Sequence, residues 1–141
     1  MKKVIISVKG TQEYPKDEPE KMELVTEGEY SLDGGIAVFR YQESELTGLA
    51  GTTTTFRLEN GDVTLTREGT VTTQMIFSEG KKHYFAYETP YGSMTMGIDT
   101  SSIYSRLRKS GGDLEIRYNI DAANSIISKN TFNINIREAG R

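Results

Sequence analysis

Hydrophobic and polar residues alternate with a period of two along most of the chain, and a helical period is hard to find. Alternation of this kind predicts β-strands with one buried and one exposed face. In the longest run, one face carries Met22, Leu24, Thr26, Gly28, Tyr30 and Leu32. Gly28 in the middle of this run indicates a bend, because glycine weakens a plain strand but allows a sheet to curve.

The alternation occurs in a series of segments that are separated by turns. They lie at residues 4–9, 22–32, 36–42, 52–59, 62–67, 71–77, 83–89, 94–100, 114–120 and 132–136. Asn60-Gly61 is a strong hairpin signal, because both residues tolerate the positive φ angles of a type I′ turn. Short connections favour a meander over a Greek key, and closing the meander removes exposed edges. The sequence therefore predicts an all-β fold, a single antiparallel up-and-down barrel domain of about eight to ten strands over residues 1–141.

One segment departs from the strand pattern. The alternation is lost between Ser101 and Gly112. We predict a short helix over residues 102–109, ending before Gly111-Gly112, that would plug one end of the barrel. No other helix is expected.

Length and cysteine content narrow the class of protein. A chain of 141 residues can bury an adequate core without metal or disulfide staples. The absence of cysteine excludes a disulfide framework, a thiolate zinc site and a cysteine nucleophile, and it fits a reducing compartment. The apolar run after Met1 is too short and too interrupted for a signal peptide or a membrane span. We therefore expect a cytoplasmic protein without a membrane partner.

The charge distribution gives no sign of a nucleic-acid partner. The formal net charge is −3, and no basic run is longer than two residues. Proteins that bind nucleic acids normally carry a basic face or stripe. Whether the protein forms a homodimer is left open by the sequence.

Arg67 is the clearest candidate for function, because it follows Val63 and Leu65 on their face of a predicted strand. An unpaired guanidinium inside a barrel is costly. Three interpretations remain open: Arg67 reaches solvent from the strand end, it pairs with Glu43, or it binds an anionic group of a ligand.

Tyrosines supply further candidates for a ligand wall. Tyrosine has an apolar ring and a polar tip, which suit a binding site, although they suit the core of a β-sheet as well. The predicted ligand-binding residues are Arg67, Tyr41, Glu43, Tyr87, Thr89 and Tyr91.

The sequence offers little for catalysis. His83 is the only histidine, which excludes a two-histidine metal site, and no nucleophile-elbow pattern accompanies it, so we expect it to be solvated. Glu43 and Glu45 could form an acid and base pair, but carboxylates in a loop are usually solvated. We therefore expect no enzyme, no catalytic residue, no metal and no cofactor.

Several short motifs occur in a specific order and spacing over most of the chain. They are Glu27-Gly28, YQESELTG at 41–48, the threonines at 52–55, Arg67-Glu68-Gly69, Met75, Phe77, YETPYG at 87–92, Thr100, Leu114 and Tyr118. In these residues the chain resembles the YwiB-like family of small uncharacterised bacterial proteins. The resemblance implies a calycin-type, lipocalin-like β-barrel and a bacterial cytoplasmic setting, with no assigned function and no catalytic residues to carry across.

The expected function is binding of a small molecule, an anionic one if Arg67 contacts it, inside the barrel or at its open end. The stretch from Phe39 to Phe56 is expected to form the rim, where a polar loop crosses the mouth between two strands. The alternative is a structural or protein-interaction barrel with a filled interior and no ligand. An enzyme that uses Glu43 as its acid or base is a distant third.

Overall fold

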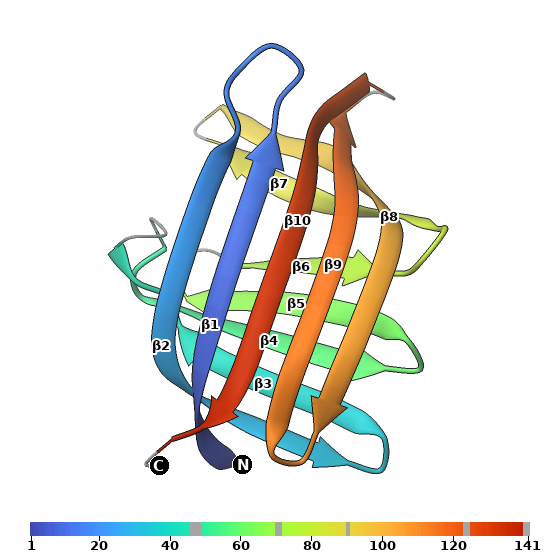
Figure 1. Cartoon of the computed structure of the whole chain (residues 1–141). Helices are drawn as coiled ribbons and strands as arrows, with labels where there is room; N and C mark the ends of the chain where they lie inside the picture. The colour runs from blue at the N-terminus through green and yellow to red at the C-terminus, as the bar shows by residue number, and fades with distance from the viewer. Residues whose placement is uncertain (46–48, 70–71, 90, 123–124, 140–141) are drawn as a thin grey trace.

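A computed structural model describes residues 1–45, 49–69, 72–89, 91–122 and 125–139, and of residues 87–89 the backbone only. Within these residues, ten strands form one antiparallel sheet that curls into a nearly closed barrel (Figure 1). The strands are β1 (Lys2–Glu13), β2 (Glu20–Asp33), β3 (Ile36–Gln42), β4 (Thr52–Glu59), β5 (Asp62–Gly69), β6 (Thr73–Phe77), β7 (Lys82–Thr89), β8 (Gly92–Arg108), β9 (Gly111–Ala122) and β10 (Ser125–Glu138). The predicted all-β fold class is confirmed.

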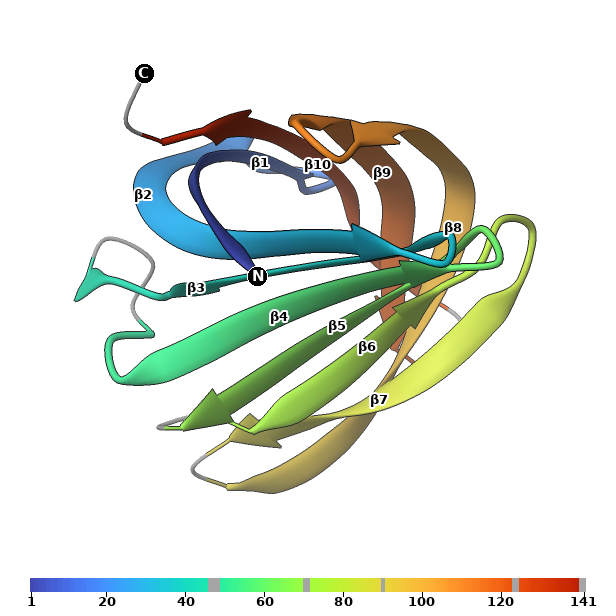
Figure 2. The same cartoon turned by 90° about the horizontal axis from the view of Figure 1, so that it is seen from below.

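The strands follow one another around the barrel in chain order, as a meander requires. β1 pairs with both β2 and β10, so the hydrogen-bonded order runs from β6 through β1 and β10 to β7. Seen from below, β3 to β7 form one wall and the remaining strands form the other (Figure 2). We call the boundary between β6 and β7 the seam, because these neighbours stand at the two ends of the hydrogen-bonded order.

β2 joins the two walls by bending at Gly28, as the sequence predicts. The strand pairs with β1 as far as Tyr30 and with β3 from Gly28 onward, and Figure 1 shows its curve. A Cβ atom at Gly28 would lie 2.4 Å from Ile6 Cδ1 and 2.5 Å from the carbonyl oxygen of Arg40. Only glycine allows the backbone of β2 to approach both neighbours this closely.

The predicted helix over 102–109 is wrong, because this segment continues β8 as far as Arg108. The ladder between β8 and β9 shifts register between Thr100 and Ser102, which leaves Ser101 as one extra residue on β8. Ile98 and Thr100 are buried before this bulge, whereas Ile103 and Leu107 pack against the core after it. Inward-facing residues have even numbers before the bulge and odd numbers after it. The strand is therefore continuous although the alternation of its residues is interrupted.

The barrel interior near the two termini is filled by apolar side chains. This apolar half consists of Val4, Ile6, Tyr30, Phe39, Phe56, Leu65, Leu114, Ile116, Ile134 and Ile136, each at most 2% exposed. The hydroxyl of Tyr30 donates a hydrogen bond of 2.7 Å to the carbonyl oxygen of Arg108, so its one polar atom is satisfied. This end of the barrel is therefore a packed core.

Candidate functional site

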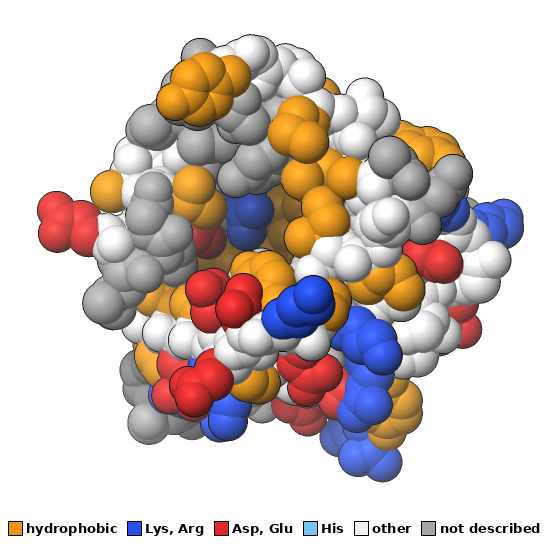
Figure 3. Space-filling model, turned by 90° about the horizontal axis from the view of Figure 1, so that it is seen from above, with side chains coloured by type: hydrophobic (Ala, Val, Ile, Leu, Met, Phe, Trp, Pro, Cys, Tyr) orange, Lys and Arg blue, Asp and Glu red, His pale blue; other side chains and the backbone are white. Residues whose placement is uncertain are grey.

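A cavity of about 500 Å³ opens at the end of the barrel opposite the termini. Its walls come from the end of β1, the start of β2, and from β5, β9 and β10. Glu43 and Leu49 add to the lining from the connection between β3 and β4, within the stretch that the sequence predicts as the rim. Figure 3 looks down on this end and shows a hollow with basic and acidic side chains deep inside it.

A row of paired residues crosses three adjacent strands and ends at one wall of the cavity, where Arg67 is the member that lines it. Tyr41 of β3 is paired with Thr54 of β4, which is paired with Arg67 of β5. Directly paired side chains on one face of a sheet lie close together, about 5 Å apart at Cβ. Tyr41 and Thr54 are buried, while Arg67 is half-buried and lines the cavity. The parity of Arg67 in the sequence therefore predicts its inward position correctly.

Glu43 stands next to this row, just beyond the end of β3. Its backbone N–H donates a hydrogen bond of 2.8 Å to the carbonyl oxygen of Thr52, which holds the residue against β4. Glu43 is only 8% exposed, and it lies close enough to Tyr41 to act on the pKa of that hydroxyl. Burial raises the pKa of Tyr41 most, Glu43 raises it further and Arg67 lowers it, so Tyr41 remains a neutral donor at physiological pH.

Three polar atoms of this wall are buried without a hydrogen-bond partner in the part of the chain that the structure describes. They are Arg67 Nε, Glu43 Oε2 and Thr54 Oγ1. The ion pairs within 4.0 Å among the described residues include neither Arg67 nor Glu43, so the two opposite charges face one cavity without pairing directly. Each buried polar group without a partner costs about 1–3 kcal/mol, so this wall is incomplete by itself.

The opposite wall continues the polar layer. Thr100 of β8 is paired with Tyr118 of β9, which is paired with Asn130 of β10. Thr100 Oγ1 and Asn130 Oδ1 are also buried without a partner among the described residues, while Asn130 Nδ2 donates to Ser128 Oγ at 3.0 Å. Burial raises the pKa of Tyr118, and Arg67 lowers it, which places the guanidinium within electrostatic reach of this wall.

We call these residues the polar half; they are Tyr41, Glu43, Thr54, Arg67, Thr100, Tyr118 and Asn130. Of these, Glu43, Arg67 and Tyr118 line the cavity. Thr100, Tyr118 and Asn130 were not among the predicted site residues. Thr100 shares its parity with Ile98, and Asn130 shares its parity with Phe132 and Ile134. The sequence could have revealed both residues, because each is a polar residue at a position that alternates with apolar ones. Asn130, however, lies outside the predicted strand 132–136, whereas β10 begins at Ser125.

Aromatic rings separate the two halves and form an apolar floor for the cavity. The rings of Tyr118 and Phe132, both in the lining, have centroids 5.7 Å apart. Phe77 meets the ring of Tyr118 edge to face at 4.8 Å, and Phe56 meets Phe132 edge to face at 6.0 Å. The cavity thus combines a few converging polar groups with an apolar surface, the usual composition of a small-molecule site.

Of the remaining predicted ligand-binding residues, only Tyr91 has a side chain that the structure describes, and it does not join this cluster. Tyr91 is fully exposed at the turn between β7 and β8 and is not part of the cavity lining. The side chains of Tyr87 and Thr89 lie outside the described residues. Glu45 is exposed, so the suggested acid and base pair of Glu43 and Glu45 does not form in a shared buried site.

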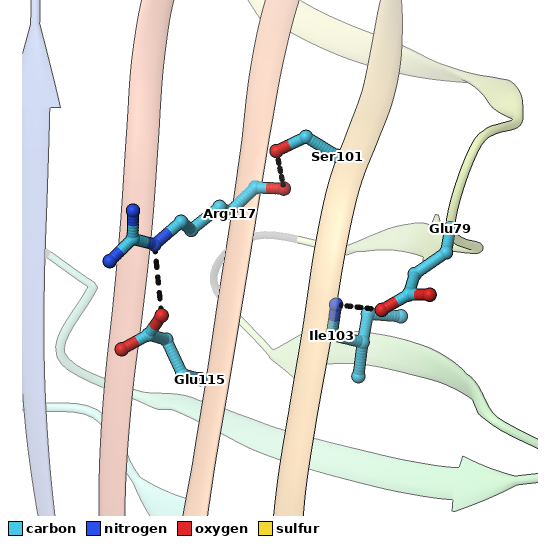
Figure 4. Close-up of polar contacts among 5 residues, drawn as sticks. All are labelled: Glu79, Ser101, Ile103, Glu115 and Arg117. Carbon is cyan, nitrogen blue, oxygen red and sulfur yellow. Dashed lines mark hydrogen bonds and ion pairs between the residues drawn. The ribbon is translucent and has the colours of Figure 1, made fainter.

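Polar contacts near the seam and at the bulge of β8 lie apart from the cavity. The backbone N–H of Ile103 donates a hydrogen bond of 2.6 Å to Glu79 Oε1, which ties the turn after β6 to β8 beyond its bulge (Figure 4). In the bulge itself, Ser101 Oγ donates to the carbonyl oxygen of Arg117 at 3.1 Å. These contacts hold together neighbouring parts of the barrel where the strand ladder is interrupted.

His83 is half-buried near the seam, so the expectation that it is solvated is wrong. Its Nε2 lies 3.0 Å from Ser78 Oγ, a hydrogen-bonding distance. Ser78 is 3% exposed, and neither it nor His83 lines the cavity of the polar half. In the described residues, no group of three or more His, Cys, Asp or Glu side chains could hold a metal ion. No helix in the same residues is long and apolar enough to cross a membrane.

Comparisons with known proteins agree with this architecture. The family model described as "Domain of unknown function (DUF1934)" matches residues 6–134. The crystal structure of the ywiB protein from Bacillus subtilis superposes with a TM-score of 0.85, at 22% sequence identity, over 99% of this chain and 93% of that one. At this identity the likeness shows the fold alone. No curated protein sequence gives a significant match.

The family match covers nearly all of the barrel, from β1 to β10. The structural likeness covers the same elements and agrees with the family that the sequence motifs indicate. The chain therefore belongs to the DUF1934 family, a YwiB-like family of antiparallel β-barrel proteins.

Proposed function

We propose that this protein binds a small polar molecule in the cavity of the polar half, with Arg67 and Glu43 as its main contacts. One observation carries the proposal: the oppositely charged side chains of Arg67 and Glu43 line the same cavity, and Arg67 Nε and Glu43 Oε2 have no hydrogen-bond partner in the described residues. Native proteins satisfy the great majority of buried polar groups. A bound molecule would give both charged side chains a partner at once.

The size and lining of the cavity support this function. A volume of about 500 Å³ lies within the range of about 300–1,000 Å³ that is usual for small-molecule sites. The lining includes the rings of Tyr118 and Phe132, which offer an apolar surface to the carbon skeleton of a ligand. The ligand would thus be held by polar groups at one side and by rings at the floor.

The protein acts in this proposal as a binder and not as an enzyme. Of the two acidic residues in the described lining, Glu43 is buried and Glu20 is exposed. The described lining therefore offers no buried pair of carboxylates for acid and base catalysis. Ser78 and His83, which contact each other, are absent from the cavity lining.

One observation favours the alternative of a structural barrel that works through its outer surface. The apolar half is packed solid, with Phe56 and Leu65 at most 1% exposed. A barrel with a purely structural role needs only such a core. The two functions differ in what they expect of the polar half: the binding function expects a ligand there, whereas the structural alternative expects a filled interior without one, and the cavity of about 500 Å³ favours the first.

Native mass spectrometry of protein purified from its host tests the proposal. We expect the wild-type protein to carry a small-molecule adduct that the Arg67→Met variant lacks. The matched control is Arg57→Met, because Arg57 lies on the neighbouring strand β4 but is exposed and pairs with Glu59 at 3.1 Å. This control should keep the adduct.

The melting temperature separates loss of the ligand from loss of the fold. With ligand removed from all samples, Arg67→Met should melt at the wild-type temperature or above, because it removes a guanidinium that lacks a partner for its buried Nε. The proposal is contradicted if no adduct is found on the wild type and none forms after incubation with a metabolite extract of the host.

A further inference from the structure

The charges around the cavity are balanced but separated. Its described lining contains two basic residues, Lys21 and Arg67, and two acidic residues, Glu20 and Glu43. A site with this balance has no net preference for an anion or a cation. It favours instead a ligand that carries one positive and one negative charge. Such a molecule leaves the net charge of the site unchanged and can place each of its charges beside a side chain of opposite charge.

The two charged groups deep in the cavity lack different kinds of hydrogen-bond partner. Arg67 Nε carries a hydrogen and needs an acceptor, whereas Glu43 Oε2 needs a donor. Tyr41 is the neutral neighbour of Glu43 and carries no positive charge to balance this carboxylate. A simple anion would satisfy Arg67, but it would leave Glu43 Oε2 without a donor and bring two negative charges together.

We propose that the ligand is a compact zwitterion of the α-amino acid type, an inference that rests on the proposed binding function. Its carboxylate pairs with the guanidinium of Arg67, which lines the cavity. Its ammonium donates to Glu43 Oε2. Its side chain lies on the rings of Tyr118 and Phe132, which form the apolar floor.

The test compares molecules that share a carbon skeleton and differ in charge. Thermal-shift measurements on ligand-free wild-type protein with each proteinogenic amino acid identify the one that stabilises most. Calorimetric titration then compares that amino acid with the acid that lacks its ammonium and with the amine that lacks its carboxylate. We expect the amino acid to bind more tightly than either analogue by about tenfold or more, since each analogue leaves one buried charged group unpaired.

Two variants connect the result to the proposed contacts. Arg67→Met should abolish binding of the amino acid. Glu43→Gln should reduce its affinity to that of the acid analogue, whose own binding should be unchanged or stronger. Arg57→Met is the control that keeps wild-type affinities, and thermal melts of all three variants verify that they fold.

The possible failures of the two proposals can be told apart. The zwitterion inference is overturned if the acid analogue binds as tightly as the amino acid, or if no amino acid binds at millimolar concentration. In either case the proposed binding function still stands when native mass spectrometry finds a different adduct that depends on Arg67. It falls only when that experiment also finds no adduct.

Discussion

The two halves of the barrel interior are built on the same strands from different kinds of residue. On β4, Phe56 points into the apolar half, and two residues away Thr54 points into the polar half. On β5, Leu65 and Arg67 stand in the same relation. Phe56 and Thr54 are equally inaccessible, at 1% and 0% exposed. The difference between the halves is therefore chemical and does not reflect a gradual opening of the barrel.

This difference shows which half requires a functional explanation. Phe56 stacks on Phe39 with ring centroids 4.8 Å apart, so its burial favours folding. Thr54 Oγ1 has no hydrogen-bond partner among the described residues, so its burial opposes folding. Departures from the rules of a stable core are expected at functional sites, where the surrounding structure must compensate for them.

The largest expected effect comes from the apolar half. Phe56→Ala should lower the free energy of unfolding by about 3–5 kcal/mol, because it removes a buried ring and leaves a cavity. Phe56 also contacts Phe132 edge to face, so the cavity floor loses support. Urea unfolding monitored by circular dichroism measures the change. A loss below about 1 kcal/mol would mean that this half is not the main source of stability.

An intermediate effect is expected from the buried tyrosines at high pH. Burial raises the pKa values of Tyr41 and Tyr118, and that of Tyr30, above the ordinary value of about 10. Above this pH the unfolded chain releases protons that the folded barrel keeps. The free energy of unfolding should therefore fall with rising pH, by up to about 1.4 kcal/mol per pH unit for each of Tyr41 and Tyr118 and by less for Tyr30, and none of this slope should appear well below pH 10.

A pair of variants isolates the contribution of the polar half to that slope. Tyr41→Phe should make the alkaline decrease in the free energy of unfolding less steep by the share of one tyrosine. Tyr84→Phe is the matched control, because Tyr84 is 65% exposed, and it should keep the wild-type slope. Equal slopes for wild type and Tyr41→Phe would show that Tyr41 is not held neutral by its surroundings.

The smallest effect should come from Thr54→Val, and its sign is the informative part. The change replaces a buried hydroxyl that has no partner in the described residues with a methyl group of similar size. We expect the ligand-free protein to be unchanged or more stable, by at most about 1 kcal/mol. Urea unfolding beside Phe56→Ala provides the comparison. A loss of stability as large as that of Phe56→Ala would mean that the Thr54 hydroxyl has a structural role.

The sequence was sufficient for the barrel because a period of two specifies which residues face inward. It failed where one extra residue changes that parity, as Ser101 does in β8. A single bulge leaves the strand intact and is invisible to a search for alternation. The predicted helix over 102–109 was the consequence.

The candidate site was predictable only in part, for a related reason. Arg67 could be found because it is a charged residue that follows Val63 and Leu65 at alternate positions of one strand. Its closeness to Thr54 depends on the register between β4 and β5, and the opposite wall depends on the registers that align Thr100, Tyr118 and Asn130. Register is a relation between strands, so it cannot be read from the residues of one strand alone.

The central claim is that the polar half is complete only with a ligand, and a crystal structure of protein purified from its host tests it most directly. The account predicts non-protein electron density in the cavity, within hydrogen-bonding distance of both Arg67 Nε and Glu43 Oε2. A cavity that holds only water, with the Arg67 guanidinium bonded directly to the Glu43 carboxylate, would contradict it.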